Sequence, residues 1–362
     1  MRQILQAISG VDWITMIPVV ILLIISLSTL FSIDSSFFKS QFLFVILSFG
    51  IMIFFSQINP NILRSYAPPI YIVSIFLLLI ILFLGIESRG SVRWLEIFGL
   101  RFQFSEILKP FLAISLASFL SDRRDYSFST FLICFVALAP IVLLIFLQPD
   151  LGNALIYLGV LIIALLTYGF PIKYFAAGFI AWIATLPFFW LILHDYQRQR
   201  ILAFLNPSSD PLGKSYNAIQ AIIAVGSGSF IGKGLGQGTQ SVLQFLPEHH
   251  TDFIFATISE EFGFVGSLIV VACFVFLLYR IYSIYLKESD TFSQIFTIIA
   301  FFLIFIHFFI NVGMNIGILP VVGVTLPFVS YGGASLLSNF ILLGLLFAIN
   351  RTSSRRSVLE IG

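Results

Sequence analysis

The chain has 362 residues, of which 59% are hydrophobic and only 10% are charged, and its formal net charge at pH 7 is +2. A soluble domain is close to half apolar and a quarter charged, so this composition excludes an ordinary soluble protein and indicates a polytopic membrane protein. The small net charge also argues against a nucleic-acid partner.

Apolar runs of about 20 residues can cross the hydrocarbon core of a bilayer as helices. The sequence contains ten such runs, which predicts an all-α membrane protein built as one integral membrane domain over residues 1–362. The fourth run and the last three are interrupted by polar residues, Pro or Gly. The runs are 12–32, 38–56, 69–86, 104–121, 128–147, 151–169, 172–193, 253–279, 292–319 and 327–350.

Basic residues in the short connections indicate the orientation of the chain. If the amino terminus is cytoplasmic, the inner connections and the tail are rich in Arg and Lys, whereas the shortest outer connections hold only Lys39. The inner basic residues are Arg64, Arg123, Arg124, Lys173, Arg280, Lys287, Arg351, Arg355 and Arg356. This orientation places the long loop 194–252, between spans 7 and 8, outside the cell. A loop of that length usually carries function or its own folded element.

The connector 87–103 is the exception to this charge rule, because it is an outer segment with three arginines, Arg89, Arg93 and Arg101. One explanation is an anionic ligand on the outer side. The other is an amphipathic interfacial helix whose arginines reach lipid headgroups. The sequence leaves both explanations open.

Glu106 and Lys109 lie three residues apart near the outer end of the fourth span, so a helix places them on one face. Charges inside a membrane segment normally face a cavity or each other. The pair is therefore either a structural ion pair between helices or a site in which Lys109 binds phosphate and Glu106 orients it.

Two further acidic residues have mainly structural interpretations. Asp150 opens the sixth span in Gln-Pro-Asp-Leu-Gly and is expected to cap that helix. Glu260 lies about 12 Å beyond Asp252 along the eighth span at 1.5 Å per residue. We expect it to pair with a cation from the outer loop or from another helix.

The segment 245–253 (FLPEHHTDF) gathers polar chemistry where the outer loop meets the eighth span. Asp252, just before an apolar run, has the position of a helix N-cap. A carboxylate at a helix amino terminus also stays ionised, so it could accept a proton from a substrate hydroxyl. Capping and catalysis are compatible, because a carboxylate has two oxygens.

Two glycine-rich stretches have no catalytic motif of their own. The run 226–238 (GSGSFIGKGLGQG) lacks the spacing of a dinucleotide or phosphate loop, so we expect a flexible loop with backbone contacts to substrate. The stretch 317–333 breaks two helices with Pro and Gly, which predicts a packed outer turn beside a cavity. The sequence contains no recognisable metal-binding motif, so a dedicated protein metal site has little support.

Taken together, these motifs resemble the shape, elongation, division and sporulation family of RodA, FtsW and SpoVE, over nearly the whole chain. The motifs are 89–109 (RGSVRWLEIFGLRFQFSEILK), 148–152 (QPDLG), 206–217 (NPSSDPLGKSYN), 239–253 (TQSVLQFLPEHHTDF) and 311–333 (NVGMNIGILPVVGVTLPFVSYGG). The loop motifs are more similar to RodA, the elongation member. The chain departs from the family at Phe104, where Pro commonly precedes Ser-Glu, which bears on the placement of Glu106.

The resemblance implies ten helices in the bacterial inner membrane and polymerisation of undecaprenyl-linked lipid II on the extracytoplasmic side. It also implies a class B penicillin-binding protein as partner. The essential aspartate of the family falls on Asp252, and its polar cavity residues fall on Glu106 and Lys109.

Our hypothesis from the sequence is that Asp252 deprotonates the acceptor sugar 4-hydroxyl, which attacks the anomeric carbon of the donor with loss of undecaprenyl pyrophosphate. Cations stabilise such a leaving group strongly in a dry site. A divalent ion, Mg²⁺ or Mn²⁺, could bind through the pyrophosphate itself. The predicted substrate contacts are Arg93, Glu106, Lys109, Asp150, Arg198, Arg200, Glu248 and His250.

Two other functions are compatible with a membrane protein of this kind. A lipid II flippase would also hold intramembrane charges and broken helices, but it should concentrate polar residues near the midplane and show repeat symmetry. A scaffold that only recruits a crosslinking enzyme would not depend on Asp252.

Overall fold

The computed structural model describes residues 10–360, apart from 89–90, 98–99, 124, 194, 207–212, 214 and 243–244. Within these residues, nine helical segments are long and apolar enough to cross a membrane. They are α2 (Trp13–Ile33), α3 (Ser35–Ser56), α5 (Ala67–Leu84), α6 with α7 (Phe104–Ile107 and Lys109–Ser121), α8 (Phe128–Leu147), α9 (Leu151–Tyr168), α14 (Ile254–Lys287), α15 (Thr291–Asn315) and α16 (Gly333–Glu360). The seventh predicted run forms α10 (Ile172–Ile192), an apolar helix with Pro187 inside. The predicted helical membrane architecture is confirmed.

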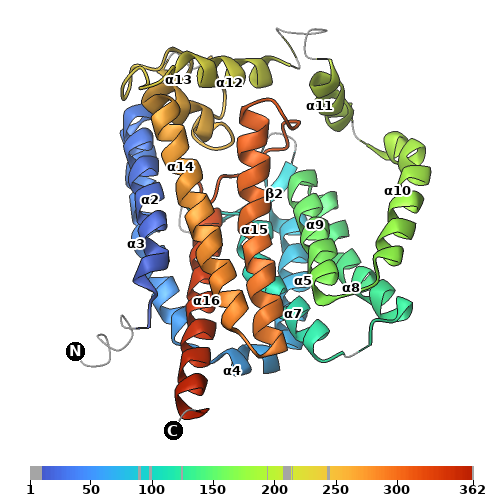
Figure 1. Cartoon of the computed structure of the whole chain (residues 1–362). Helices are drawn as coiled ribbons and strands as arrows, with labels where there is room; N and C mark the ends of the chain where they lie inside the picture. The colour runs from blue at the N-terminus through green and yellow to red at the C-terminus, as the bar shows by residue number, and fades with distance from the viewer. Residues whose placement is uncertain are drawn as a thin grey trace.

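Figure 1 shows that the molecule has two distinct ends. The start of α2, the end of α16 and the short helix α4 (Pro60–Ser65) lie at one end, and the helices of the 194–252 loop lie at the other. Predicted inner basic residues are paired at the first end, where Arg64 bonds Asp122 and Arg280 Nη2 lies 2.7 Å from Asp12 Oδ2. These two predicted inner arginines therefore lie at the end of the bundle opposite the 194–252 loop.

The long loop has secondary structure of its own, as its length suggested. It contains α11 (Asp195–Leu205), α12 (Tyr216–Ser227) and α13 (Thr239–Val242). In Figure 1, α12 and α13 lie over the top of α14, whereas α11 lies beside α10 on the other side of the molecule. The loop therefore covers the end of the bundle from which α14 starts.

The connector 87–103 forms strands, so the interfacial-helix interpretation was wrong. Strands β1 (Ile86–Ser88), β2 (Ser91–Ile97) and β3 (Leu100–Phe102) make an antiparallel sheet in the order β1-β2-β3. Two residues, one of them Gly, separate each pair of strands, which is the usual length of a tight hairpin connection. Arg89 lies outside the described residues. The sheet directs Arg93 from the middle of β2 toward the start of α9, as its ion pair with Asp150 shows.

Helix α14 is broken at Gly263, whose φ of 67° and ψ of −159° are not helical. The glycine-rich run fills this break: Lys233 N donates to the Glu260 carbonyl, and Phe264 N donates to the Ser229 carbonyl. The run is therefore a packed strap on α14, and the expectation of a flexible loop was wrong. A side chain at Gly232 would lie 2.1 Å from the Glu261 carbonyl oxygen, so the close approach requires glycine.

Glu260 on this broken helix is fully buried, and its partner is the predicted loop cation. Lys233 Nζ lies 3.0 Å from Glu260 Oε1, which also accepts from Gln240 N at 3.0 Å and Thr239 Oγ1 at 3.2 Å. The carboxylate thus fixes α13 and the strap onto α14. The structural interpretation of Glu260 is confirmed.

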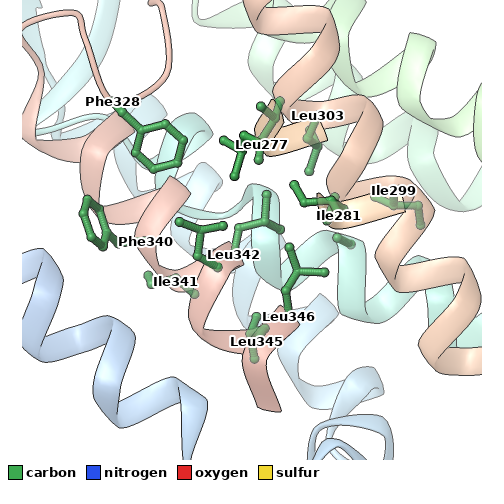
Figure 2. Packing of buried hydrophobic residues seen from close by; sticks show 14 of the residues in the cluster. Leu277, Ile281, Ile299, Leu303, Phe328, Phe340, Ile341, Leu342, Leu345 and Leu346 are labelled. Atoms are coloured by element: carbon green, nitrogen blue, oxygen red, sulfur yellow. The ribbon is translucent and has the colours of Figure 1, made fainter. Parts of the chain in front are cut away.

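The centre of the bundle is an apolar contact between α14, α15 and α16 (Figure 2). Pairs four residues apart point to one face of each helix, because that spacing is close to one helical turn. The pairs are Leu277 and Ile281 on α14, Ile299 and Leu303 on α15, and Leu342 and Leu346 on α16. In lipid such close packing, rather than escape from water, holds helices together. These three helices therefore form the frame that holds the polar residues around Asp252 and Lys109.

Candidate functional site

Asp252 lies one residue before the cap of α14, so its predicted role as the helix N-cap was wrong. The cap is Phe253, and the helix begins at Ile254. The first turn is instead stabilised from α15, where Asn315 Oδ1 accepts a hydrogen bond from Ala256 N at 3.1 Å. Because Asp252 does not cap α14, its side chain belongs to the turn that precedes the helix.

The backbone of Asp252 is held by two asparagines of α15. Asn311 Nδ2 and Asn315 Nδ2 each donate to the Asp252 carbonyl oxygen at 3.0 Å. Asn311 Nδ2 also donates to the Val324 carbonyl at 2.7 Å. The two amides are almost fully buried, and they fix the aspartate against both α15 and the broken segment 316–332.

The turn that contains Asp252, residues 246–253, is organised by Glu248. Its φ of 56° is left-handed, and its carbonyl accepts from Thr251 N at 3.1 Å and Phe253 N at 3.2 Å. Its carboxylate accepts from Thr251 Oγ1 at 3.2 Å, and Ser330 Oγ donates to the Thr251 carbonyl at 2.7 Å. These contacts show that Glu248, predicted to bind substrate, shapes the turn that presents Asp252.

The two histidines of this turn have different surroundings. His249 is buried, and its Nδ1 lies 2.9 Å from the Leu246 carbonyl, so Nδ1 carries the hydrogen. Burial lowers the pKa of His249 below its usual value, although the Leu246 carbonyl and Glu248 oppose the shift. The half-buried ring of His250 stacks on Phe37 at 4.4 Å between centroids. At neutral pH His249 is therefore an uncharged structural group of the turn.

The Asp252 carboxylate lies against bare backbone of the broken segment. A Cβ placed on Gly323 would be 3.3 Å from Asp252 Oδ2, and the φ of Gly323 is +73°. Both the contact and the conformation favour glycine at this position. Asp252 remains half-buried, so its carboxylate is neither sealed in the core nor fully in solvent. This exposure is suitable for a group that must meet a bound hydroxyl.

Glu106 and Lys109 form a buried cluster with His307, which the sequence analysis did not identify. Lys109 Nζ lies 2.7 Å from Glu106 Oε1 and 2.6 Å from His307 Nε2. His307 Nδ1 lies 3.2 Å from the Thr325 carbonyl, which can only accept, so Nδ1 donates and Nε2 is left to accept from Lys109. The lysine starts α7 next to Pro110, where proline is well tolerated. The cluster therefore presents an ammonium group whose position is fixed by two partners.

A second polar cluster surrounds Asp150. Its carboxylate caps α9 by accepting from Asn153 N at 3.3 Å, as predicted. It also accepts from Gln103 Nε2 at 2.7 Å and Ser105 Oγ at 3.2 Å, and Arg93 Nη1 lies 3.8 Å from Oδ1. Asp150 thus fixes the sheet and the start of α6 to α9, and it holds Arg93 near them.

His307, Asn311 and Asn315 are the main residues that sequence reasoning missed. They are spaced by four residues on α15 and so lie on one face, successive members about 6 Å apart at 1.5 Å per residue. The first contacts Lys109, and the other two contact Asp252. Polar residues repeated every four positions in an apolar span were the available signal.

The structure does not bring all predicted cations to this site. The guanidinium of Arg198 donates to the Trp190 carbonyl at 2.8 Å and the Leu191 carbonyl at 2.9 Å, at the end of α10. Arg200 is on the same short helix, α11, which Figure 1 places away from α14. Among the predicted site cations whose side chains are described, Lys109 and Arg93 are the ones that lie near the starts of α6, α7 and α9.

No group of three or more His, Cys, Asp or Glu side chains close enough to bind a metal occurs in the described part of the chain. A divalent metal ion at this site would need most of its ligands from a bound substrate. The arrangement can supply a carboxylate base at Asp252 and an oriented ammonium group at Lys109, and these two residues contact α15 one helical turn apart, at Asn311 and His307.

The chain is similar to known proteins over nearly its full length. The family model of the cell cycle proteins FtsW, RodA and SpoVE matches residues 4–355. The peptidoglycan glycosyltransferase MrdB of Escherichia coli (strain K12) is 40% identical over 302 residues, which cover 83% of this chain and 82% of that protein. Stage V sporulation protein E of Bacillus subtilis (strain 168) is 36% identical over 329 residues, or 88% of this chain and 89% of that protein.

Solved structures also resemble this fold. One is a chain from a study of polymerization and crosslinking by a peptidoglycan synthase complex, with a TM-score of 0.84 and 29% identity over 95% of this chain and 98% of that one. Another is the rod shape determining protein RodA of Thermus thermophilus, with a TM-score of 0.72 and 25% identity over 94% and 97% of the two chains.

Proposed function

This chain belongs to the family of the cell cycle proteins FtsW, RodA and SpoVE, and we propose that Asp252 is the general base of its glycosyl transfer. The chain is a peptidoglycan glycosyltransferase that acts in cell-wall synthesis. The observation that carries the proposal is the geometry of Asp252, a half-buried carboxylate whose backbone is fixed by Asn311 and Asn315. A base that is fixed in place gives more rate than one that must be oriented in each turnover.

The substrate of the proposed reaction is lipid II, which supplies both donor and acceptor. Asp252 removes the proton of the acceptor 4-hydroxyl as its oxygen forms a bond to the anomeric carbon of the donor. The bond from that carbon to the pyrophosphate breaks with inversion, and undecaprenyl pyrophosphate leaves with the electron pair. General-base help of this kind contributes roughly 10²–10⁴-fold in rate.

Lys109 and Arg93 are the groups that stabilise the departing pyrophosphate. Glu106 and His307 accept hydrogen bonds from Lys109 and so fix its ammonium group. Arg93 is about a third exposed, so its guanidinium can reach a ligand as well as Asp150. Preorganised cations in a site that excludes water are well suited to a leaving anion. Where a divalent ion takes part, it binds through the pyrophosphate, with few protein ligands.

The cellular setting follows from the same argument. The substrate is anchored in the bacterial inner membrane, and Asp252 lies at the end of the bundle opposite the predicted inner basic residues Arg64 and Arg280, which we assign to the extracytoplasmic side. The identity to MrdB is higher than the identity to stage V sporulation protein E, and this difference, together with the similarity to RodA structures, supports a role in elongation and cell shape. A class B penicillin-binding protein is the expected partner, because new glycan strands must be crosslinked.

Polymerisation by the purified protein tests the proposal and separates it from its rivals. Wild type and Asp252→Ala are reconstituted with lipid II that carries a labelled sugar, and glycan ladders are resolved on gels. We expect ladders from the wild type alone. Transbilayer movement of lipid II without polymer would indicate a flippase, and unchanged ladders from Asp252→Ala would eliminate the base.

A further inference from the structure

A cavity follows helix α7 through the bundle. Its volume is about 390 Å³, and its walls come from α5, α7, α8, α9 and α15. Lys109 lies at one end of α7, and Asp122 follows the other end, so both ends of the cavity are marked by charged residues. The 13 residues of α7 extend about 20 Å at 1.5 Å per residue. The cavity therefore runs from the buried Lys109 cluster toward the inner end of the bundle.

The walls between these two ends are almost entirely apolar. They include Leu112, Leu116, Leu138 and Ile141, and α15 contributes Leu303. The tyrosine hydroxyls that line the cavity are bonded to protein backbone: Tyr71 donates to the Ala137 carbonyl, and Tyr157 donates to the Ser105 carbonyl at 2.9 Å. A polar solute would find few partners here, whereas a hydrocarbon chain would fit.

We propose that this α7 cavity binds the first isoprene units of the donor lipid, whose pyrophosphate is held at Lys109. The inference rests on the proposed function, because it uses Lys109 as the pyrophosphate site. The one ammonium group in the lining lies at the end of the cavity nearest the predicted outer surface, where a lipid of the outer leaflet places its headgroup. A chain that starts at this ammonium and enters the membrane has the α7 cavity directly in its path.

The size of the cavity sets how much of the chain it can hold. At about 30 Å³ for a group the size of a water molecule, 390 Å³ accommodates roughly a dozen carbon atoms, or two to three isoprene units. The rest of a long polyprenyl chain would remain in the bilayer. Because lipid is already apolar, the cavity adds mainly close contacts and orientation, and not escape from water. Its expected role is to align the anomeric carbon with the acceptor.

Two neighbouring residues of α8 provide a matched pair of variants. Ala137 lines the cavity, whereas Val136 is 70% exposed on the outer surface of the bundle. Ala137→Trp should fill the cavity, and Val136→Trp adds the same ring outside it. The measurement is inhibition of polymerisation by inorganic pyrophosphate and by a C15 prenyl pyrophosphate, in nanodiscs of fixed composition.

In the wild type, the C15 compound should inhibit at a concentration about tenfold or more below that of inorganic pyrophosphate, since 1.4 kcal/mol corresponds to tenfold. Ala137→Trp should abolish most of this difference without weakening inhibition by inorganic pyrophosphate, and Val136→Trp should preserve it. An unchanged ratio in folded, active Ala137→Trp would overturn the inference. Loss of inhibition by both compounds in that variant would overturn it too, because the effect would then lie at the headgroup.

A photoreactive C15 pyrophosphate with a diazirine at the chain end gives a second measurement on the unaltered protein. The expected crosslinks fall on α7 and α8, near Leu116, Cys134 and Leu138, and excess lipid II should suppress them. Crosslinks on residues outside the walls of the cavity, or suppression by phosphatidylglycerol instead of lipid II, would contradict the inference. Polymerisation by Asp252→Ala would instead contradict the proposed function, so the two failures are distinguishable.

Discussion

His307 and Asn311 lie one turn apart on α15 and connect the two halves of the site. His307 Nε2 contacts Lys109 Nζ at 2.6 Å, and Asn311 Nδ2 donates to the Asp252 carbonyl at 3.0 Å. Both also bind the broken segment 316–332, through the Thr325 carbonyl at 3.2 Å and the Val324 carbonyl at 2.7 Å. The position of the base relative to the cation is thus determined by one rigid helix.

Two replacements of His307 should distinguish the effect of its hydrogen bonds from the effect of its size. His307→Phe keeps a ring but removes the acceptor for Lys109 and the donor to Thr325, so we expect kcat to fall about tenfold to a hundredfold, as for a lost charged hydrogen bond of 1.5–3 kcal/mol. His307→Gln can supply both an acceptor and a donor and should recover most of the rate. Equal loss in both variants, measured as kcat and KM for lipid II, would show that the hydrogen bonds are not responsible.

Asn311→Leu should impair catalysis by releasing the Asp252 turn. The variant removes one donor from the Asp252 carbonyl and leaves the buried Val324 carbonyl unpaired, at a cost of about 1–3 kcal/mol. We expect a fall in kcat of about tenfold. Asn339→Leu is the control, because the Asn339 amide bonds only to Ser335 of its own helix among the contacts described. A similar loss of rate in both variants would argue for a general packing effect.

Lys233→Met should destabilise the protein by leaving the buried carboxylate of Glu260 without its cation. Loss of one partner of a fully buried pair costs about 3–5 kcal/mol, and the partial exposure of Lys233 reduces our expectation to about 1–3 kcal/mol. The double variant with Glu260→Gln should regain part of that stability. Thermal unfolding in detergent measures the effect, with Lys39→Met as an exposed control. No difference between the single and double variants would contradict the role of the ion pair.

The buried His249 should make stability depend on pH. Because its pKa is lower in the folded protein than the usual 6.5, protonation favours the unfolded chain. Its stabilising effect is therefore complete above pH 6.5 and declines as the pH falls below that value. Unfolding temperatures of wild type and His249→Gln, compared from pH 8 to pH 5, should converge toward low pH. Parallel curves would indicate that His249 is not the titrating group.

The spans could be predicted from the sequence because each requirement is local. A run of about 20 apolar residues suffices for a membrane helix, and the spacing of Glu106 and Lys109 already placed them on one face. The strands of 86–102 were missed because they are short and their alternation is weak. Their signal was the two glycine-containing connections.

The site itself depends on contacts between segments that are distant in the sequence, and no short stretch of sequence predicts such contacts. Asp252 has the sequence position of an N-cap, but Asn315 from another helix provides an acceptor to the first turn of α14, so the carboxylate is placed one residue earlier. Arg198 was predicted to be a cation of the site, but its guanidinium instead donates hydrogen bonds to two carbonyls at the end of α10. The partner of Lys109 at His307 is 198 residues away in the chain and has no local pattern.

The most direct test of the account is the single-turnover rate of Asp252→Asn. This change keeps the size of the side chain and an acceptor oxygen but removes the basic carboxylate, so lipid II binding should be retained. We predict that the rate of glycosidic bond formation falls about 10²–10⁴-fold, the contribution of a general base. A rate close to that of the wild type, with lipid II bound equally well, would contradict the proposed base.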